Sequence, residues 1–108
     1  MAEGFLVDYG PENESRVVRF IGQLDLADAP RAKEIGLAAL AELNGNGAPL
    51  ILDLSELTFC DSSGVHALYA ILAQAMASGH PVTLRRPHPV VRRVLELTDT
   101  LPLFTNEE

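Results

Sequence analysis

Apolar positions recur with two different periods along the chain, and the two periods predict strands and helices in alternation. Residues 4–9 and 16–25 are short apolar-rich runs, and residues 10–15 between them carry the Gly, Pro and Asn of a turn. We therefore predict that the chain opens with a β-hairpin. Residues 49–55 form an almost unbroken apolar run, which is typical of a central strand buried on both faces. Residues 81–86 predict a further strand.

Three other segments have apolar residues at helical spacing, which predicts a helix in each. In the first, 26–47, Asp28 can serve as the N-cap, Pro30 lies in the first turn and the run Asn-Gly-Asn-Gly stops the helix. The second helix is expected at 62–79 and the third at 87–100. Their apolar stripes are, in order, Ile35, Ala39 and Leu43; Val65, Leu68, Ile71, Leu72, Ala75 and Met76; and Val90, Val91, Val94 and Leu95.

The order of the elements determines the expected fold. The chain reads strand, strand, helix, strand, helix, strand, helix, and its last short apolar piece, residues 101–108, is a candidate for one further short strand. Strands that alternate with helices form a mostly parallel sheet, and the opening hairpin makes that sheet mixed. We therefore expect one α/β domain over residues 1–108: a two-layer sandwich of a mixed, mostly parallel β-sheet with helices on one face.

The charge is uneven along the chain, and this narrows the range of partners. Residues 1–61 hold eleven acids against four bases, residues 62–108 hold four of each, and the formal net charge is −7. Such a surface repels nucleic acid, which proteins bind through clustered Lys and Arg. The excess charge can steer a basic protein partner toward the chain, or it can merely keep a small protein soluble.

The sequence shows no signal for a membrane or for an oxidising compartment. No apolar run reaches the roughly 20 residues of a membrane span, and the acidic N-terminus lacks the features of a signal peptide. The single cysteine, Cys60, rules out an internal disulfide. We therefore expect a cytoplasmic protein in which Cys60 is a small buried apolar residue, with redox sensing as the alternative.

The motifs of the common catalytic and cofactor sites are missing from the sequence. There is no G-x-S-x-G elbow, no S-x-x-K pair and no glycine-rich phosphate loop. The three histidines lack the paired spacing of a metal site. His80 and His88 each lie beside a proline at an element boundary, and we expect both to be solvated loop residues. The sequence thus predicts neither an enzyme nor a metal or cofactor site.

The segment LTFCDSSGVHALYAIL, residues 57–72, places two hydroxyl groups where a strand ends and a helix begins. Asp61 or Ser62 can serve as the N-cap, because the first backbone N–H groups of a helix have no partners within it. The same helix start carries positive partial charge, which favours an anion such as a phosphate. A helix cap and a phosphorylation switch therefore both remain open as the role of this segment.

A second stripe of this helix is free to face a partner. It is offset from the apolar stripe that begins at Val65, so the core does not require it. Its members are Ser62, His66, Tyr69 and Ala73.

Three blocks together resemble the STAS domain family, in its form as a bacterial anti-sigma factor antagonist. The strongest is LILDLSELTFCDSSGVHAL, in which an apolar strand, D-L-S, a short linker and D-S-S-G precede an apolar helix. IGQLDLADAP resembles the family's G-E-L-D segment, and GHPVTLRRPHPVVRRVLELT resembles a later block. The resemblance covers residues 4–104 and implies the fold expected above.

The resemblance also implies a mechanism. In such families the unphosphorylated antagonist binds an anti-sigma factor, which is a serine kinase of the GHKL type, and the sigma factor is released. The kinase phosphorylates the serine directly after the motif's aspartate, which maps to Ser62, and a PP2C-type phosphatase restores the active form. Ser63 is the secondary candidate, and Asp25 maps to the aspartate of G-E-L-D. The residues expected to bind the partner are Asp25, Asp61, Ser62, Ser63, Gly64, His66 and Tyr69.

Two departures from the family pattern lie near the C-terminus. Residues 98–104, TDTLPLF, replace a glycine turn, and the chain stops at Glu108 where many members continue into a final helix. These departures bear on the choice of partner, since that end can form part of an interface. The alternative interpretation is a STAS subunit of another assembly, either a stressosome component or the accessory subunit of a lipid-transport ATPase.

Overall fold

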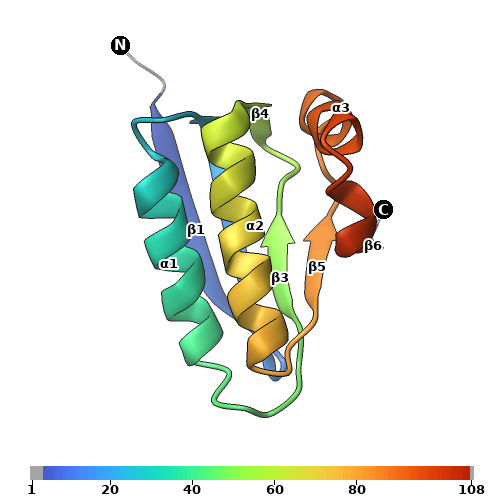
Figure 1. Ribbon diagram of the computed structural model, residues 1–108. Helices are drawn as coiled ribbons and strands as arrows, with labels where there is room; N and C mark the ends of the chain where they lie inside the picture. Colours follow the sequence, from blue (N-terminus) through green and yellow to red (C-terminus); the bar gives the residue numbers. More distant parts are fainter. Residues whose placement is uncertain (1–3, 108) are drawn as a thin grey trace.

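The computed structural model describes residues 4–107, which form one six-stranded mixed sheet with three α-helices (Figure 1). The sheet order is β1-β2-β3-β5-β6, and β4 pairs with β2 beyond the end of β3. Only β1 and β2 are antiparallel; every other pair is parallel. The elements are β1 (Phe5–Glu12), β2 (Ser15–Leu24), α1 (Ala29–Ala41), β3 (Leu50–Asp53), β4 (Leu57–Cys60), α2 (Ser62–Ala77), β5 (Val82–Arg85), α3 (Pro89–Leu97), the 3₁₀ turn η1 (Leu101–Leu103) and β6 (Thr105–Glu107).

The predicted fold class is confirmed. Helices α1 and α2 lie side by side over one face of the sheet, and α3 lies on the other side of α2 from α1, beside the end of β5 (Figure 1). The mixed, mostly parallel sheet follows from the opening hairpin and the strand-helix alternation that comes after it. The core between the two layers is built from the inward residues of β2, β3 and β5 and from the facing sides of the helices.

The opening hairpin has a much tighter turn than the sequence predicts. Strand β1 continues through Glu12, so only Asn13 and Glu14 separate the two strands, and Asn13 adopts a positive φ of 56°. Pro11 fits within β1 because this strand is at the edge of the sheet, where a missing N–H costs no interior ladder bond. Turn-forming residue types alone therefore overestimated the length of the loop.

Helix α1 is shorter than expected at both ends. Its N-cap is Asp28, as predicted, and Pro30 is in the first turn, but the Asp28 side chain makes no capping hydrogen bond. Residues 25–28 instead form a turn before the helix begins. After Ala41 the chain passes through Asn44 and Gly45, both with positive φ, which is the stop that the sequence indicates.

Helices α1 and α2 approach each other closely at Gly36. A Cβ atom at this position would overlap the side chain of Ile71 on α2. Glycine costs about 1 kcal/mol relative to alanine within a helix. The close packing of the two helices explains why a glycine is nevertheless present at position 36.

The predicted apolar stripes are confirmed in most positions, but not in all. The second helix buries Val65, Leu68, Ile71, Leu72 and Ala75, whereas Met76 is 67% exposed. The third helix buries Val91 and Leu95, whereas Val90 is 47% exposed. Both exceptions are at the margin of an apolar stripe, where spacing alone does not determine how far the core extends.

Of two short strands in the structure, the sequence pattern indicated only the one at the C-terminus. Residues 57–60, expected as part of a linker, form β4 and pair in parallel with the second half of β2. At the C-terminus, β6 pairs in parallel with β5. Strands of three or four residues are too short for an alternation to be visible, so only their pairing partners define them.

The expectation that both loop histidines are solvated was wrong for His80. Its side chain is buried, and its Nδ1 atom lies 2.7 Å from the carbonyl oxygen of Ala48. His88 is half-buried and acts as the N-cap of α3, where its Nδ1 accepts a hydrogen bond of 3.2 Å from the Val90 N–H. Both histidines therefore fix loop geometry.

None of the helices within residues 4–107 is both long enough and apolar enough to cross a membrane.

Candidate functional site

The serine segment is placed by the pairing of two strands. Leu24 at the end of β2 pairs in register with Cys60 at the end of β4. The Asp61 N–H continues this pairing, donating a hydrogen bond of 3.2 Å to the Leu24 carbonyl oxygen. Asp25 and Asp61 therefore follow paired positions and leave the sheet at the same edge. The structure thus brings together two of the segments that the sequence singled out.

Asp61 is the N-cap of α2. Its backbone is extended, with φ −96° and ψ −172°, and its Oδ1 accepts a hydrogen bond of 3.1 Å from the Gly64 N–H. Its carbonyl oxygen accepts the first helical bond, from the Val65 N–H at 3.0 Å. Of the two capping candidates, the structure therefore selects Asp61. Neither serine hydroxyl forms a hydrogen bond within the described residues 4–107, so the capping role does not use them.

Close packing against the ends of β2 and β4 requires a glycine at position 64. A Cβ atom at this position would lie 2.6 Å from the Cys60 Sγ and 2.9 Å from the Leu24 carbonyl oxygen. No side chain fits at such distances unless the start of α2 moves away from the sheet. The glycine thus allows the helix to begin directly above the paired ends of β2 and β4.

Cys60 lies beneath this helix start and is 2% exposed. Burial, and to a smaller extent the neighbouring Asp61 carboxylate, raises the pKa of the Cys60 thiol to about 12. The thiol is therefore protonated at neutral pH, which makes it a poor nucleophile. This agrees with the expected role as a small buried residue.

The predicted stripe of α2 reaches the surface. Ser62, His66, Tyr69 and Ala73 are all exposed, and Tyr69 exposes 49% of its surface. Ser63, one position from Ser62, is half-buried. The stripe is thus available to a partner from Ser62, at the start of the helix, to Ala73.

Asp25 builds the turn that leads into α1. Its Oδ1 accepts a hydrogen bond of 3.0 Å from the Ala27 N–H, and its carbonyl oxygen accepts from the N–H groups of Asp28 and Ala29. A side-chain bond to the backbone two residues on is the geometry of an Asx turn. The sequence pointed to Asp25 only through the family resemblance. In the structure, Asp25 stabilises the turn that precedes α1.

The same turn presents a residue that the sequence did not single out. Leu26, at the tip of the turn, is 74% exposed, although the pattern placed it at the start of a helix. It borders a hollow of about 320 Å³ between α1 and α2. We call this the Leu26 hollow; it is lined by Leu26, Ala29, Pro30, Lys33, Ser63, His66, Ala67 and Ala70. An exposed leucine in a turn has no periodic signature, so only the structure could find it.

A second hollow lies on the other side of the stripe. It has a volume of about 310 Å³ and is lined by Tyr69, Leu72, Ala73, Met76 and Leu103. Tyr69 thus lies at an apolar hollow, which fits the predicted partner-binding role of this side chain.

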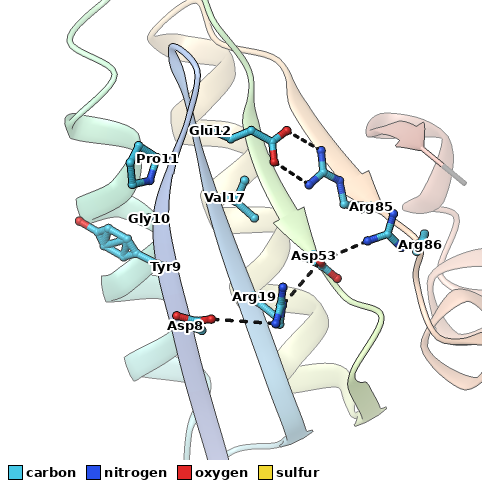
Figure 2. A pocket seen from close by; sticks show the side chains of 10 residues that line it. All are labelled: Asp8, Tyr9, Gly10, Pro11, Glu12, Val17, Arg19, Asp53, Arg85 and Arg86. Carbon is cyan, nitrogen blue, oxygen red and sulfur yellow. Dashed lines mark hydrogen bonds and ion pairs between the residues drawn. The ribbon is translucent and has the colours of Figure 1, made fainter.

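The sheet face turned away from α1 and α2 carries a set of paired charges (Figure 2). Arg85 forms two hydrogen bonds with Glu12, at 2.8 and 3.0 Å, and crosses β2 and β3 to do so. Asp53 is almost fully buried, and Arg19 and Arg86 each lie 3.7 Å from its Oδ2. These charged residues line a hollow of about 300 Å³. Because their charges pair with one another, the hollow is better explained as part of a structural network than as a ligand site.

Asp53 and Ser55, from the D-L-S segment, shape the loop between β3 and β4. Asp53 Oδ1 accepts hydrogen bonds from the Ser55 N–H at 3.0 Å and from the Ser55 hydroxyl at 2.7 Å. Burial by itself raises the pKa of Asp53, but these bonds and the nearby charges of Arg19 and Arg86 outweigh it and hold the pKa below its ordinary value. The segment therefore sets the path of the chain into β4 and Ser62.

The fold and the helix start define a small mixed α/β domain with an exposed serine directly after its capping aspartate. The chain belongs to the STAS domain family: the family model described as "Mlab, STAS domain" matches residues 8–100. A comparison with curated protein sequences gives no match.

Solved structures of similar fold include several anti-sigma factor antagonists. A candidate antagonist of Thermotoga maritima has a TM-score of 0.82 at 22% identity, covering 94% of this chain and 86% of its own. An antagonist of Mycobacterium paratuberculosis has a TM-score of 0.78 at 26% identity, covering 96% and 86%. SpoIIAA, a Bacillus cell fate determinant solved in its phosphorylated form, has a TM-score of 0.68 at 23% identity, covering 97% and 92%. By name, these relatives are regulators rather than enzymes.

Proposed function

We propose that this protein is a phospho-regulated anti-sigma factor antagonist. In its unphosphorylated form it binds an anti-sigma factor that is a serine kinase of the GHKL type. Binding displaces the sigma factor and allows transcription. The kinase then phosphorylates Ser62, which ends the interaction, and a PP2C-type phosphatase restores the binding form.

The observation that carries this proposal is the position of Ser62. It is exposed at the first position of α2, while Asp61 performs the capping that a serine there could otherwise perform. The hydroxyl therefore has no structural task within residues 4–107. A residue that is accessible and structurally dispensable can be modified and restored without loss of the fold.

Ser63 is the less suitable acceptor. It is half-buried and faces the Leu26 hollow, whereas Ser62 is exposed. The two side chains also differ by about 100° around the helix axis, so that a kinase cannot approach both from one direction. Ser62 is therefore the assigned site, with Ser63 as the secondary candidate.

The proposed partner surface surrounds this serine. It comprises the capping segment and the exposed stripe of α2, together with the turn that Asp25 builds at the same sheet edge. Its members are Asp25, Asp61, Ser62, Ser63, Gly64, His66 and Tyr69. The protein acts in the cytoplasm as a single STAS domain, residues 1–108, without a cofactor.

The test is a comparison of wild type, Ser62→Asp and Ser63→Asp as baits in the native cell, with partners identified by mass spectrometry. We expect wild type and Ser63→Asp to recover a protein with a GHKL-type ATPase domain and Ser62→Asp to lose it. With that kinase and ATP, wild type should gain one phosphate, which phosphopeptide mapping places on Ser62. Recovery by Ser62→Asp as well as by wild type contradicts the proposed switch.

A second candidate function follows from the description of the matching family model, which names Mlab rather than an antagonist. In this alternative the chain is a STAS subunit of another assembly, such as a stressosome component or the accessory subunit of a lipid-transport ATPase. For a transporter subunit, the recovered partner is a transport ATPase, and purified kinase leaves Ser62 unmodified. The pull-down and the phosphorylation assay together separate the two functions.

A further inference from the structure

The loop between α1 and β3 contains two asparagine-glycine steps in succession. The segment reads Asn44-Gly45-Asn46-Gly47, and among the asparagines of the chain only these two precede a glycine. A glycine has no side chain to shield its backbone nitrogen, and it gives the chain wide conformational freedom. All four residues are exposed to water. Both steps therefore have the neighbour and the access to water that the conversion of an asparagine to an aspartate requires.

This conversion involves only the chain and water. The backbone nitrogen of the glycine bonds to the side-chain carbonyl carbon of the asparagine, loses its proton, and ammonia leaves, which closes a cyclic imide. Water then adds to a carbonyl of the ring and opens it to an aspartate or an isoaspartate. In sum, a carboxylate replaces an amide, water is consumed, ammonia is released, and nothing is oxidised or reduced. Contacts that hold the side-chain amide away from the glycine nitrogen oppose the first step.

Asn46 is held at both ends of its side-chain amide. Its Oδ1 accepts a hydrogen bond of 2.8 Å from the Ala48 N–H, and its Nδ2 donates one of 3.0 Å to the Glu14 carbonyl oxygen. The second bond joins this loop to the turn of the opening hairpin. The amide must leave both partners before its carbonyl carbon can meet the nitrogen of Gly47.

Asn44 has no comparable restraint. Within residues 4–107, neither its side chain nor the N–H of Gly45 forms a hydrogen bond. The backbone N–H of Asn44 does donate to the Ala41 carbonyl oxygen, at 3.2 Å, but none of these atoms takes part in the reaction. Both residues have a positive φ, 57° and 75°, so the attack requires the peptide between them to rotate. No hydrogen bond of the Gly45 N–H opposes that rotation.

We propose that Asn44 is a site of spontaneous deamidation in the folded protein, and that its two hydrogen bonds protect Asn46 from the same reaction. The inference is independent of the proposed function, because this loop lies at the opposite end of the helix layer from the start of α2 and Ser62 (Figure 1). The new carboxylate lies just beyond Glu42, the C-cap of α1, where the partial charge of the helix is also negative. Deamidation should therefore lower the melting temperature and leave partner binding unchanged.

The test is incubation of the full chain in mildly alkaline buffer, with peptide mapping by mass spectrometry at successive times and a parallel sample unfolded in urea. In the folded protein, Asn44 should convert about tenfold faster than Asn46 or more, since two hydrogen bonds of ordinary strength must first break at Asn46. In urea the two rates should be similar, because both asparagines precede a glycine. Asn44→Gln is the matched control: its amide is uncharged but has to close a larger ring, so fast conversion in the folded loop should disappear. Asn44→Asp supplies the product and should melt below wild type.

Each outcome decides one part of the inference. Equal rates at Asn44 and Asn46 in the folded protein would overturn the protection of Asn46. An Asn44 that stays intact in the folded protein, over a time in which the unfolded chain converts, would overturn the site. A preference for Asn44 that is as large in urea as in buffer would show that the local sequence sets it, and the role of the hydrogen bonds would be lost. An Asn44→Asp variant that melts with wild type or above it would contradict the expected effect of the new charge.

Discussion

Gly64 at the start of α2 lies directly against Cys60 at the end of β4, with room for no atom beyond Cα. A Cβ atom at position 64 would be 2.6 Å from the Cys60 Sγ. The close contact explains why a glycine ends the D-S-S-G motif, and it ties the position of Ser62 to the edge of the sheet. The placement of the proposed switch therefore depends on the packing of two residues that take no part in the chemistry.

Substitution of Gly64 by alanine should destabilise the protein by about 1–3 kcal/mol, the usual cost of overpacking a core. The neighbouring Leu24 carbonyl oxygen, at 2.9 Å from the added Cβ, belongs to the sheet and cannot move away cheaply. Urea denaturation measures the change. Gly10→Ala serves as the control, because a Cβ there meets nothing within 4 Å; an equal loss in both variants would contradict the packing argument.

Phosphorylation of Ser62 should abolish binding without unfolding the protein. A phosphoserine adds about −1.5 to −2 charge near pH 7, and the start of α2 favours that charge by about 0.3–1 kcal/mol. Asp61 and Asp25 oppose it by a similar order, so the two effects nearly cancel in the free protein. At an interface an unpaired phosphate must be desolvated, and a cost of about 3 kcal/mol weakens binding more than a hundredfold.

Thermal melting and calorimetric titration of the phosphorylated and free forms check this prediction. We expect melting temperatures that differ by less than about 8 °C, since a larger shift corresponds to about 1–2 kcal/mol for a domain of this size. A larger decrease would indicate that the phosphate acts by disrupting the fold. Undiminished binding would remove Ser62 as the switch.

Replacement of Tyr69 by alanine should weaken kinase binding by about 1–3 kcal/mol, because tyrosines buried at interfaces are frequent anchors. Tyr69 is 49% exposed and borders an apolar hollow, so its truncation leaves the core intact. His66→Ala, one turn nearer to Ser62, should have a smaller effect. Titration of both variants with the kinase decides the matter, and wild-type affinity for a folded Tyr69→Ala variant would exclude the stripe from the interface.

The buried carboxylate of Asp53 should make stability depend on pH in acid. Burial raises the pKa of Asp53. The hydrogen bonds from Ser55 and the charges of Arg19 and Arg86 lower it by a larger amount, so the folded-state pKa lies below the unfolded value. The stabilising contribution is therefore complete above the unfolded pKa, about 3.9 for aspartate, and is lost as the pH falls through the folded pKa.

Asp53→Asn should lower the free energy of unfolding at pH 7 by about 1–2 kcal/mol, in the range of typical single substitutions. The difference from wild type should shrink as the pH falls below about 4. Urea denaturation at pH 7 and pH 3 measures both values. A difference that stays constant over this range would show that the charge of Asp53 is not the stabilising feature.

The sequence by itself determined the features that depend on local chemistry. The hairpin, the three helices and the buried strand β3 follow from periodicity and from turn residues, because these act over a few neighbouring positions. The exposed stripe of α2 follows from helical spacing alone. The D-S-S-G segment could be recognised because it occurs with two further blocks in a fixed order.

The tertiary structure decided whatever depends on contacts between distant segments. Strand β4 is defined only by its pairing with β2, and the buried His80 lies against the carbonyl oxygen of Ala48, which is 32 positions earlier in the chain. Asp61 rather than Ser62 caps α2: its Oδ1 accepts the Gly64 N–H, at a glycine that packs directly against Cys60 of β4. Leu26 is exposed because it lies in a turn, which no periodic pattern predicts. It lines a hollow together with residues of α2 because the fold places that turn beside the helix.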